Sequence, residues 1–355
     1  MMHIRRHEMR RLSAALAGSA LVLALAGCGG GGDEGSSDKL TYAGFGGITQ
    51  EVQSETQLKP FAKEFGVKVT ETQPAEFAKL KVMVESKNVS WDVIDGLGYM
   101  TGPNCGTLFE PLDFDVIDTT NIPDDMVSKC SVPMYLSAQM LFYNGKEFKE
   151  GEAPTTWADF FDVEKFPGKR GISKDVTAGA LELALLADGV KPEDLYPLDY
   201  KRALKKLDTI KDHFVYWSTG AEQQQQMESG QVSIMMGWPG RAYGAAQNDA
   251  SFEPVWGATL FVFDVFAVPK GTPHLETAMK YINYAIGAGP QAAFADKVPY
   301  AAVRSDVKPS SDPMIAKFAP TLDKREQYKF VTQDMEWWGD NIDAMVKAWT
   351  AWTAG

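Results

Sequence analysis

Short apolar segments alternate along the chain with stretches in which apolar residues recur at helical spacing. The first unit is a strand over 40–43, a glycine-rich loop over 44–47, a helix that ends at 65 and a second strand over 67–70. Alternating strands and helices predict helices layered on a sheet, which is the α/β class. Further strands are expected at 91–95, 141–144 and 231–237, and further helices at 75–86, 178–187, 200–211, 222–229 and 341–352.

For two segments the sequence allows more specific predictions about a helix. Thr272 and Pro273 are typical of the N-cap and first turn of a helix, and they predict a helix that runs to Ile286. The four consecutive glutamines at 223–226 are too few for a low-complexity tract. We therefore expect these glutamines to lie on a solvated helix face.

The N-terminal residues have the pattern of an export signal. Arginines within the first 11 residues are followed by an apolar run over 12–26, which is shorter than the roughly 17 to 25 residues needed to span a bilayer. The sequence Leu-Ala-Gly-Cys that ends at Cys28 resembles the lipobox of bacterial lipoproteins. We expect residues 1–27 to be a signal peptide, Cys28 to be lipidated and residues 28–38 to be a flexible tether. A soluble secreted protein with an incidental cysteine is the alternative.

Length and charge narrow the class of protein. The chain has 355 residues, 45% of them hydrophobic, and a net charge of -12. This composition excludes a disordered or fibrous protein, and the length predicts two lobes. The acidic balance disfavours nucleic acid and anionic membrane surfaces as partners, because both bind through basic side chains.

The remaining cysteines and histidines suggest a disulfide and no metal centre. Cys105 and Cys130 are the only cysteines after Cys28, and outside the reducing cytoplasm such a pair would persist as a disulfide. The bond would stabilise the fold by about 3 to 4 kcal/mol on the chain-entropy estimate. Two unpaired thiols are the alternative. His213 and His274 lack the spacing of metal ligands, so no metal and no cofactor are expected.

Several short motifs occur together in an order and spacing that resemble the spermidine/putrescine-binding proteins of ABC importers. They are Trp91-Asp92-Val93-Ile94, Leu141-Phe142-Tyr143-Asn144, Thr156-Trp157-Ala158-Asp159-Phe160, Lys165-Phe166-Pro167-Gly168-Lys169, Gly237-Trp238 and Phe263-Asp264-Val265-Phe266-Ala267-Val268-Pro269-Lys270. The resemblance covers roughly residues 39–352.

The resemblance implies a two-lobed fold of the type II periplasmic-binding-protein class, with the ligand cleft between the lobes. One lobe would comprise residues 39–136 and 265–310, and the other residues 137–264 and 311–355. It also implies an ABC permease and ATPase as partners, and an extracytoplasmic protein held at the membrane through its lipid anchor. We expect a monomer.

Aromatic residues beside turn-forming glycine and proline are candidate cleft residues. Phe45, Tyr99 and Trp238 each follow a predicted strand, where α/β sheets collect their ligands. Trp338 lies near the place where the family has a late cleft contact. Packing in the core is the alternative for each of them, and is favoured for Trp338. Thr177 and Gln139 are further candidates that we cannot rank.

Charged residues predict the kind of ligand. By resemblance, Asp264 matches the acid that holds a ligand ammonium, whereas Arg241 stands where some putrescine-binding relatives have an aspartate. Val262 replaces an aromatic residue of the family, and Asp175 is followed by apolar and small residues instead of further acids. A long polyamine would therefore find too few acceptors.

These departures favour a short ligand with opposite charges at its two ends, an ω-amino acid such as 4-aminobutyrate. Asp264 would bind the ammonium and Arg241 the carboxylate through a two-pronged contact. Putrescine or spermidine remains an alternative ligand. A second possibility for Arg241 is that it neutralises Asp264 or points to solvent.

Other functional classes receive less support. The sequence contains no Gly-x-Ser-x-Gly elbow, His-Glu-x-x-His motif or phosphate-binding loop, so we do not expect an enzyme. A ligand-sensing partner of a membrane receptor would use the same cleft, and the sequence does not separate sensing from import.

Overall fold

The computed structural model describes residues 38–149 and 151–354. Within these residues, nine strands form one mixed sheet in the order β2-β1-β3-β8-β4-β7-β5-β6, with β9 beside β8. The strands are Lys39–Ala43 (β1), Lys68–Thr72 (β2), Val93–Leu97 (β3), Ser131–Asn144 (β4), Arg170–Ser173 (β5), Phe214–Trp217 (β6), Ile234–Gly237 (β7), Phe252–Ala267 (β8) and Val331–Thr332 (β9).

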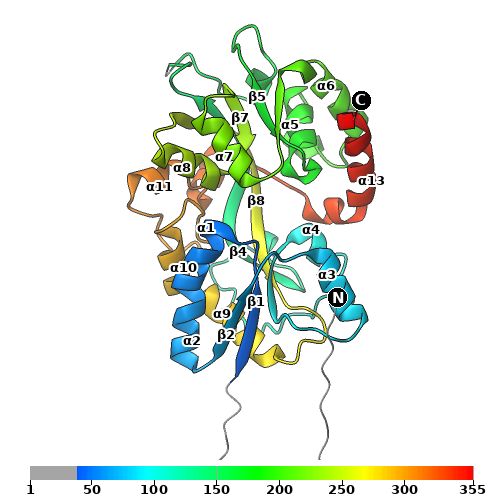
Figure 1. Cartoon of the computed structure of the whole chain (residues 1–355), viewed down its shortest axis with the longest axis vertical. Coiled ribbons are helices and arrows are strands. Elements are labelled where there is room, and N and C mark those ends of the chain that lie inside the picture. The colour runs from blue at the N-terminus through cyan, green and yellow to red at the C-terminus, as the bar shows by residue number, and fades with distance from the viewer. Residues whose placement is uncertain (1–37, 150, 355) are drawn as a thin grey trace, which may run out of the picture. The chain divides into compact units, whose positions relative to one another are not determined.

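Parallel strands form the two ends of the sheet, and two long antiparallel strands connect them. β2, β1 and β3 are parallel at one end, and β7, β5 and β6 are parallel at the other. Between them, β4 and β8 pair in antiparallel fashion along most of their length. Figure 1 shows these two strands passing from a lower group of elements, which contains β1 and β2, into an upper group, which contains β5 and β7.

Helices surround both groups (Figure 1). Their bounds are Gly47–Gln53 (α1), Lys59–Phe65 (α2), Phe77–Glu85 (α3), Gly98–Thr101 (α4), Ala180–Ala187 (α5), Tyr200–Asp208 (α6), Gly220–Glu228 (α7), Pro239–Gln247 (α8), Leu275–Ala285 (α9), Ala288–Ala295 (α10), Pro313–Phe318 (α11), Leu322–Tyr328 (α12) and Met335–Ala354 (α13). A π-helical turn, Ser54–Leu58, joins α1 to α2. The alternation of strands and helices expected from the sequence is therefore present.

β4 is much longer than its apolar pattern suggests. It begins at Ser131 rather than at Leu141, and nearly all of its residues are buried. Its register shifts between Pro133 and Tyr135. Because proline cannot donate to a strand ladder, it is tolerated at such an irregularity. Pro133 and the polar residues among 131–140 conceal this half of the strand in the sequence.

Each group of elements has its own apolar core. In the lower group the rings of Tyr42, Phe266 and Tyr281 contact one another edge to face, a favoured geometry for aromatic pairs. In the upper group the core forms around α5, which is buried along most of its length, and includes Trp349 of α13. The lobe boundaries expected from the sequence, 39–136 with 265–310 and 137–264 with 311–355, stay a prediction.

Two expectations from the sequence can be compared with the structure here: the helix start at Thr272 and the pairing of the two cysteines. The expectation that Thr272 caps a helix is wrong, because α9 begins at Leu275 after His274. The Thr272 hydroxyl instead donates to the buried carboxylate of Asp92. Cys105 and Cys130 form a disulfide with their Cα atoms 5.5 Å apart.

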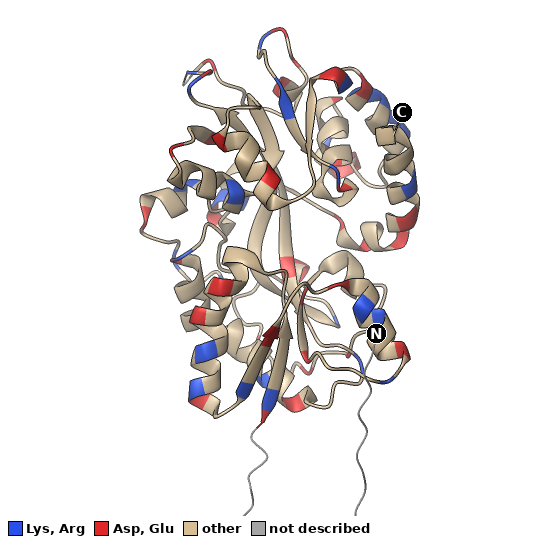
Figure 2. Ribbon diagram, in the orientation of Figure 1, with Lys and Arg blue, Asp and Glu red and all other residues tan. Residues whose placement is uncertain are grey.

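The signal peptide over 1–27 and the lipidation of Cys28 lie outside the described residues, as does nearly all of the tether over 28–38. Within the described part of the chain, no helix combines the length and the apolar character needed to cross a membrane. Lysine and arginine are interspersed with aspartate and glutamate over both groups (Figure 2). This distribution differs from the one-sided basic surface typical of a nucleic-acid-binding protein.

Candidate ligand-binding site

A pocket of about 340 Å³ lies where the two groups of elements meet, a size that suits a small solute. It draws residues from the loop after β1, from α1, β3, α4, β4, β8 and α8, and from the segments between β5 and α5, after α10 and around the start of α13. Its lining consists of Phe45, Gly46, Thr49, Asp95, Leu97, Tyr99, Tyr135, Ser137, Gln139, Asp175, Thr177, Ala178, Trp238, Arg241, Val262, Asp264, Tyr300, Gln333 and Met335.

Asp264 provides an anionic group within this pocket. It projects from β8 at a position paired with Tyr135 on β4, and the Tyr135 hydroxyl donates a hydrogen bond to its Oδ2 atom. Burial raises the pKa of the Asp264 carboxyl to about 6, and the Tyr135 hydrogen bond only partly opposes this rise. Asp264 is therefore a carboxylate at neutral pH, at a cost that a bound cation would reduce.

Asp95 is a second acid in the pocket that the sequence analysis did not single out. It lies on β3 and is only 2% exposed, and its Oδ1 atom has no hydrogen-bond partner among the described residues. Burial raises the pKa of the Asp95 carboxyl well above its ordinary range, and the charge of Asp264 raises it further. An aspartate inside the predicted buried strand at 91–95 is the sequence signal that could have identified it.

Arg241 supplies a positive charge in the same pocket. Its side chain leaves the first turn of α8 and lies against α7, where a Cβ atom added to Gly220 would be 2.3 Å from its Nε atom. A terminal nitrogen lies close to Gly47 at the start of α1. Within residues 38–149 and 151–354, the guanidinium makes no ion pair with any carboxylate, Asp264 included. The interpretation that Arg241 neutralises Asp264 therefore has no support in the structure.

Tyr300 stands between these opposite charges. Burial raises the pKa of its hydroxyl to about 12; the positive charge of Arg241 lowers that pKa and the negative charge of Asp264 raises it. The hydroxyl packs closely on the start of α8, because a Cβ atom added to Gly240 would be 2.4 Å from it. The pocket thus contains an acid and a guanidinium, and the charges of both act on the Tyr300 phenol.

Gln223 on α7 holds the segment that presents Trp238 and Arg241. Its amide nitrogen donates to the Trp238 carbonyl at 3.1 Å, and its amide oxygen accepts from the Trp238 N–H at 3.1 Å. Gln223 is fully buried and Gln226 nearly so. The expectation of a solvated glutamine face is therefore wrong for these two positions, because the polar run is turned toward buried backbone groups that require partners.

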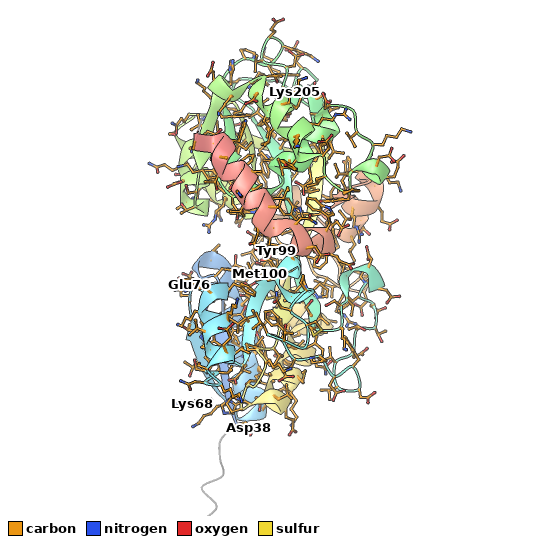
Figure 3. The ribbon with its side chains drawn as sticks, turned by 90° about the vertical axis from the view of Figure 1, so that its right-hand side faces the viewer. Asp38, Lys68, Glu76, Tyr99, Met100 and Lys205 are labelled. Atoms are coloured by element: carbon orange, nitrogen blue, oxygen red, sulfur yellow. A yellow bond between two sulfur atoms is a disulfide. The ribbon has the colours of Figure 1, made fainter. Side chains whose placement is uncertain are left out.

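The remaining expected aromatic residues form part of the pocket wall. Phe45 follows β1 and is 45% exposed, and Trp238 contacts Trp217 edge to face. Figure 3 shows Tyr99 of α4 at the level where α13 faces the lower group. Burial, and then the charge of Asp175, raise the pKa of Tyr99. Of the residues that the sequence left unranked, Gln139 and Thr177 also line the pocket.

Trp338 does not line the pocket. Its side chain is 0% exposed, and its indole N–H donates to Oε1 of the buried Glu182 at 2.7 Å. The same carboxyl oxygen accepts from Gln333 at 3.1 Å and from Tyr196 at 2.8 Å. Trp338 therefore fixes α13 in the upper core, and Gln333 and Met335 are the residues of this last segment that reach the pocket.

The described residues contain no group of three or more histidine, cysteine, aspartate or glutamate side chains arranged to hold a metal ion. The chemistry of the pocket is that of charge and hydrogen bonding. It offers carboxyl groups, one guanidinium and aromatic walls, a combination suited to binding a small charged molecule.

The chain is similar to known solute-binding proteins. The family model described as bacterial extracellular solute-binding protein matches residues 56–321. The gamma-aminobutyric acid-binding protein of Pseudomonas aeruginosa is 33% identical over 329 residues, which cover 90% of this chain and 92% of the relative. The spermidine/putrescine-binding periplasmic protein of Escherichia coli is 24% identical over 261 residues, which cover 68% of this chain and 72% of the relative.

Solved structures show the same fold. A GABA receptor structure is 37% identical, with a TM-score of 0.81, and the match covers 89% of this chain and 97% of the other. A binding protein of A. tumefaciens in complex with agropinic acid is 35% identical, with a TM-score of 0.76, and the match covers 90% of this chain and 99% of the other. The two-lobed α/β fold expected from the sequence is thereby confirmed. The chain belongs to the family of bacterial extracellular solute-binding proteins.

Proposed function

We propose that this protein captures a small ω-amino acid, with 4-aminobutyrate as the best candidate, and delivers it to an ABC permease and ATPase for uptake. Asp264 would receive the ligand ammonium and Arg241 the ligand carboxylate. Phe45, Tyr99 and Trp238 would enclose the carbon chain between the two charged ends.

One observation carries this proposal: the pocket contains two opposite charges that do not compensate each other. Asp264 has no cation beside it in the described part of the chain; its pKa responds to burial and to Tyr135. Arg241 likewise has no anionic partner there. Because an unpaired charge is costly to bury, a ligand that supplies both complements gains at each end. The relatives with 4-aminobutyrate in their names support this choice.

A diamine is the second candidate, and a specific observation favours it. Asp95, Asp175 and Asp264 all line the pocket, so a second ammonium would find a carboxyl group. Against this, a diamine would leave Arg241 without a partner and bring a like charge near it. The spermidine/putrescine-binding relative keeps this alternative open.

Isothermal titration calorimetry on the folded protein tests the proposal. The panel comprises 4-aminobutyrate, 5-aminovalerate, putrescine, spermidine, a betaine and thiamine. The proposal predicts the lowest Kd for one of the two ω-amino acids. Binding of putrescine or spermidine alone would replace the zwitterion proposal with the polyamine one. A neighbouring permease and ATPase gene would favour import over a role as the ligand-sensing partner of a membrane receptor.

The family membership supports a binding role rather than catalysis, and we infer that the protein is not an enzyme. We further propose that the mature protein is a monomer anchored at the outer side of the membrane through lipidated Cys28. The lipobox-like sequence that ends at Cys28 supports this proposal. A Cys28→Ser variant should lose its lipid and no longer fractionate with membranes, whereas unchanged fractionation would contradict the anchor.

A further inference from the structure

Asp95 and Asp264 lie on neighbouring antiparallel strands and face the same pocket. Asp264 on β8 pairs with Leu97 on β3, two residues beyond Asp95. Residues two apart on a strand lie on the same face, and directly paired residues share that face. The two carboxyl groups are therefore diagonal neighbours on one face of the sheet, and both line the pocket.

Asp95 is a buried acid that lacks a compensating partner. Its side chain is 2% exposed, and its Oδ1 atom is unpaired among the described residues. Leaving a buried polar atom without a partner is energetically costly. The pocket into which it faces is therefore a place where a donor would be bound favourably.

The titratable groups around this acid pair are mainly phenols, and Asp175 and Arg241 are the other charged residues that line the same pocket. The charge of Asp95, of Asp264 or of both raises the pKa of five tyrosines. These are Tyr42 on β1, Tyr135 on β4, Tyr281 on α9, Tyr300 between α10 and α11, and Tyr99 on α4. Arg241 on α8 acts on Tyr300, and no cation contributes to the pKa shift of either acid. In the empty protein, protonation of one carboxyl group would reduce the repulsion between the two.

We propose that Asp95 and Asp264 together form the receptor for a primary ammonium group, with Asp95 neutral in the empty protein and releasing its proton when the ligand binds. This inference rests on the proposed function, because it concerns the ammonium end of the same site. It adds a specificity: the ligand must carry N–H donors at that end.

The hydrogen-bonding capacity of the pair explains this specificity. Oδ2 of Asp264 already accepts from Tyr135, which leaves its other oxygen and Oδ1 of Asp95 for the ligand. A primary ammonium has three N–H donors and can donate a hydrogen bond to each of these two oxygens. Its positive charge favours the ionised form of Asp95, whose proton passes to the buffer. A trimethylammonium group has no N–H donor and would leave both oxygens unpaired.

Titration calorimetry in two buffers of different ionisation enthalpy, such as Tris and phosphate, counts the protons released on binding. The probe is 4-aminobutyrate at pH 7, with putrescine as a second primary amine. The proteins are the wild type, Asp95→Asn and the control Asp115→Asn, which removes one exposed acidic charge far from any pocket residue in sequence. Asparagine at 95 keeps the size of the side chain but has no proton to release.

The inference predicts release of a substantial fraction of one proton from the wild type and the control, and close to none from Asp95→Asn. Affinity of the wild type should continue to increase above pH 7, by at most about tenfold per pH unit for one released proton. The affinity of Asp95→Asn should be nearly flat over that range. The wild-type pH profile tests the inference even if the variant does not fold.

Binding of 4-aminobutyrate to the wild type without proton release would overturn this inference and leave the proposed function intact. Equal proton release by Asp95→Asn would also overturn it. If 4-trimethylammoniobutyrate bound as tightly as 4-aminobutyrate, the requirement for N–H donors would be wrong. Absence of binding by every amine tested would instead contradict the proposed function.

Discussion

Replacement of Arg241 with alanine should separate zwitterionic ligands from diamines. In the proposed complex the guanidinium makes two charge-assisted hydrogen bonds to the ligand carboxylate. Such bonds contribute about 1.5 to 3 kcal/mol each. Solvent screening makes their sum smaller here, because Arg241 is partly exposed. The expected loss is about 2 to 4 kcal/mol, which raises the Kd for 4-aminobutyrate by about 30- to 1,000-fold.

The same substitution should leave the affinity for putrescine unchanged or increase it. Putrescine has no carboxylate, and alanine removes a like charge from the pocket. The stability of the protein should change little, because Arg241 makes no ion pair in the described part of the chain. Kd values for both ligands from calorimetry, with the melting temperature of the empty protein, provide the comparison.

Two further variants control for charge and geometry. Arg241→Lys keeps the charge but cannot make the two-pronged contact, so its affinity for 4-aminobutyrate should be intermediate. Arg202→Ala removes the same charge from α6, where Arg202 is exposed and pairs with Asp188, and should leave both affinities unchanged. An equal loss of 4-aminobutyrate and putrescine binding in Arg241→Ala would refute the reasoning and make Arg241 a structural residue.

Three more outcomes are expected. Gln223→Leu leaves the Trp238 N–H without its partner, while the Trp238 carbonyl still accepts from the N–H groups of Arg241 and Ala242. The unfolding free energy in urea should therefore fall by about 1 to 3 kcal/mol, whereas exposed Gln225→Ala should cost little. Replacement of Cys105 and Cys130 by serine should lower the unfolding free energy by about 2 to 4 kcal/mol. An unchanged unfolding free energy would show that the disulfide does not stabilise the fold. Because the pKa of Asp264 is raised to about 6, its carboxylate is present above that pH and protonated below, so calorimetry should show amine affinity falling on acidification through pH 6.

Strand ends could be located from the sequence, and with them much of the pocket. Phe45, Tyr99 and Trp238 each come soon after an apolar strand, and the structure brings all three to one pocket with Asp264. This works because a ligand site between strand ends depends on the order of strands and helices, which hydrophobic periodicity indicates.

Burial of polar residues could not be predicted in the same way. Gln223 belongs to a glutamine run that resembles a solvated face, yet it is buried and makes two hydrogen bonds with the backbone of Trp238. Asp95 lies near the phenols of Tyr42 on β1 and Tyr281 on α9, whose pKa values its charge raises. Elements distant in the sequence create these environments, so the local pattern of apolar and polar residues cannot predict them.

Trp338 is a residue that was expected near the ligand but is buried in the core, and the local sequence does not show this. A tryptophan near a family contact position can point either way from its helix. The deciding partner is Glu182 on α5, whose carboxyl oxygen accepts its indole N–H. The residues that reach the pocket from this segment are Gln333 and Met335, which precede Trp338 in the sequence.

A crystal structure of the protein with 4-aminobutyrate tests the central claim most directly, because it shows both ends of the ligand at once. We predict the ammonium within hydrogen-bond distance of Asp264 and the carboxylate paired with the guanidinium of Arg241. A bound ligand with its ends reversed, or with both side chains turned away from it, would contradict the account.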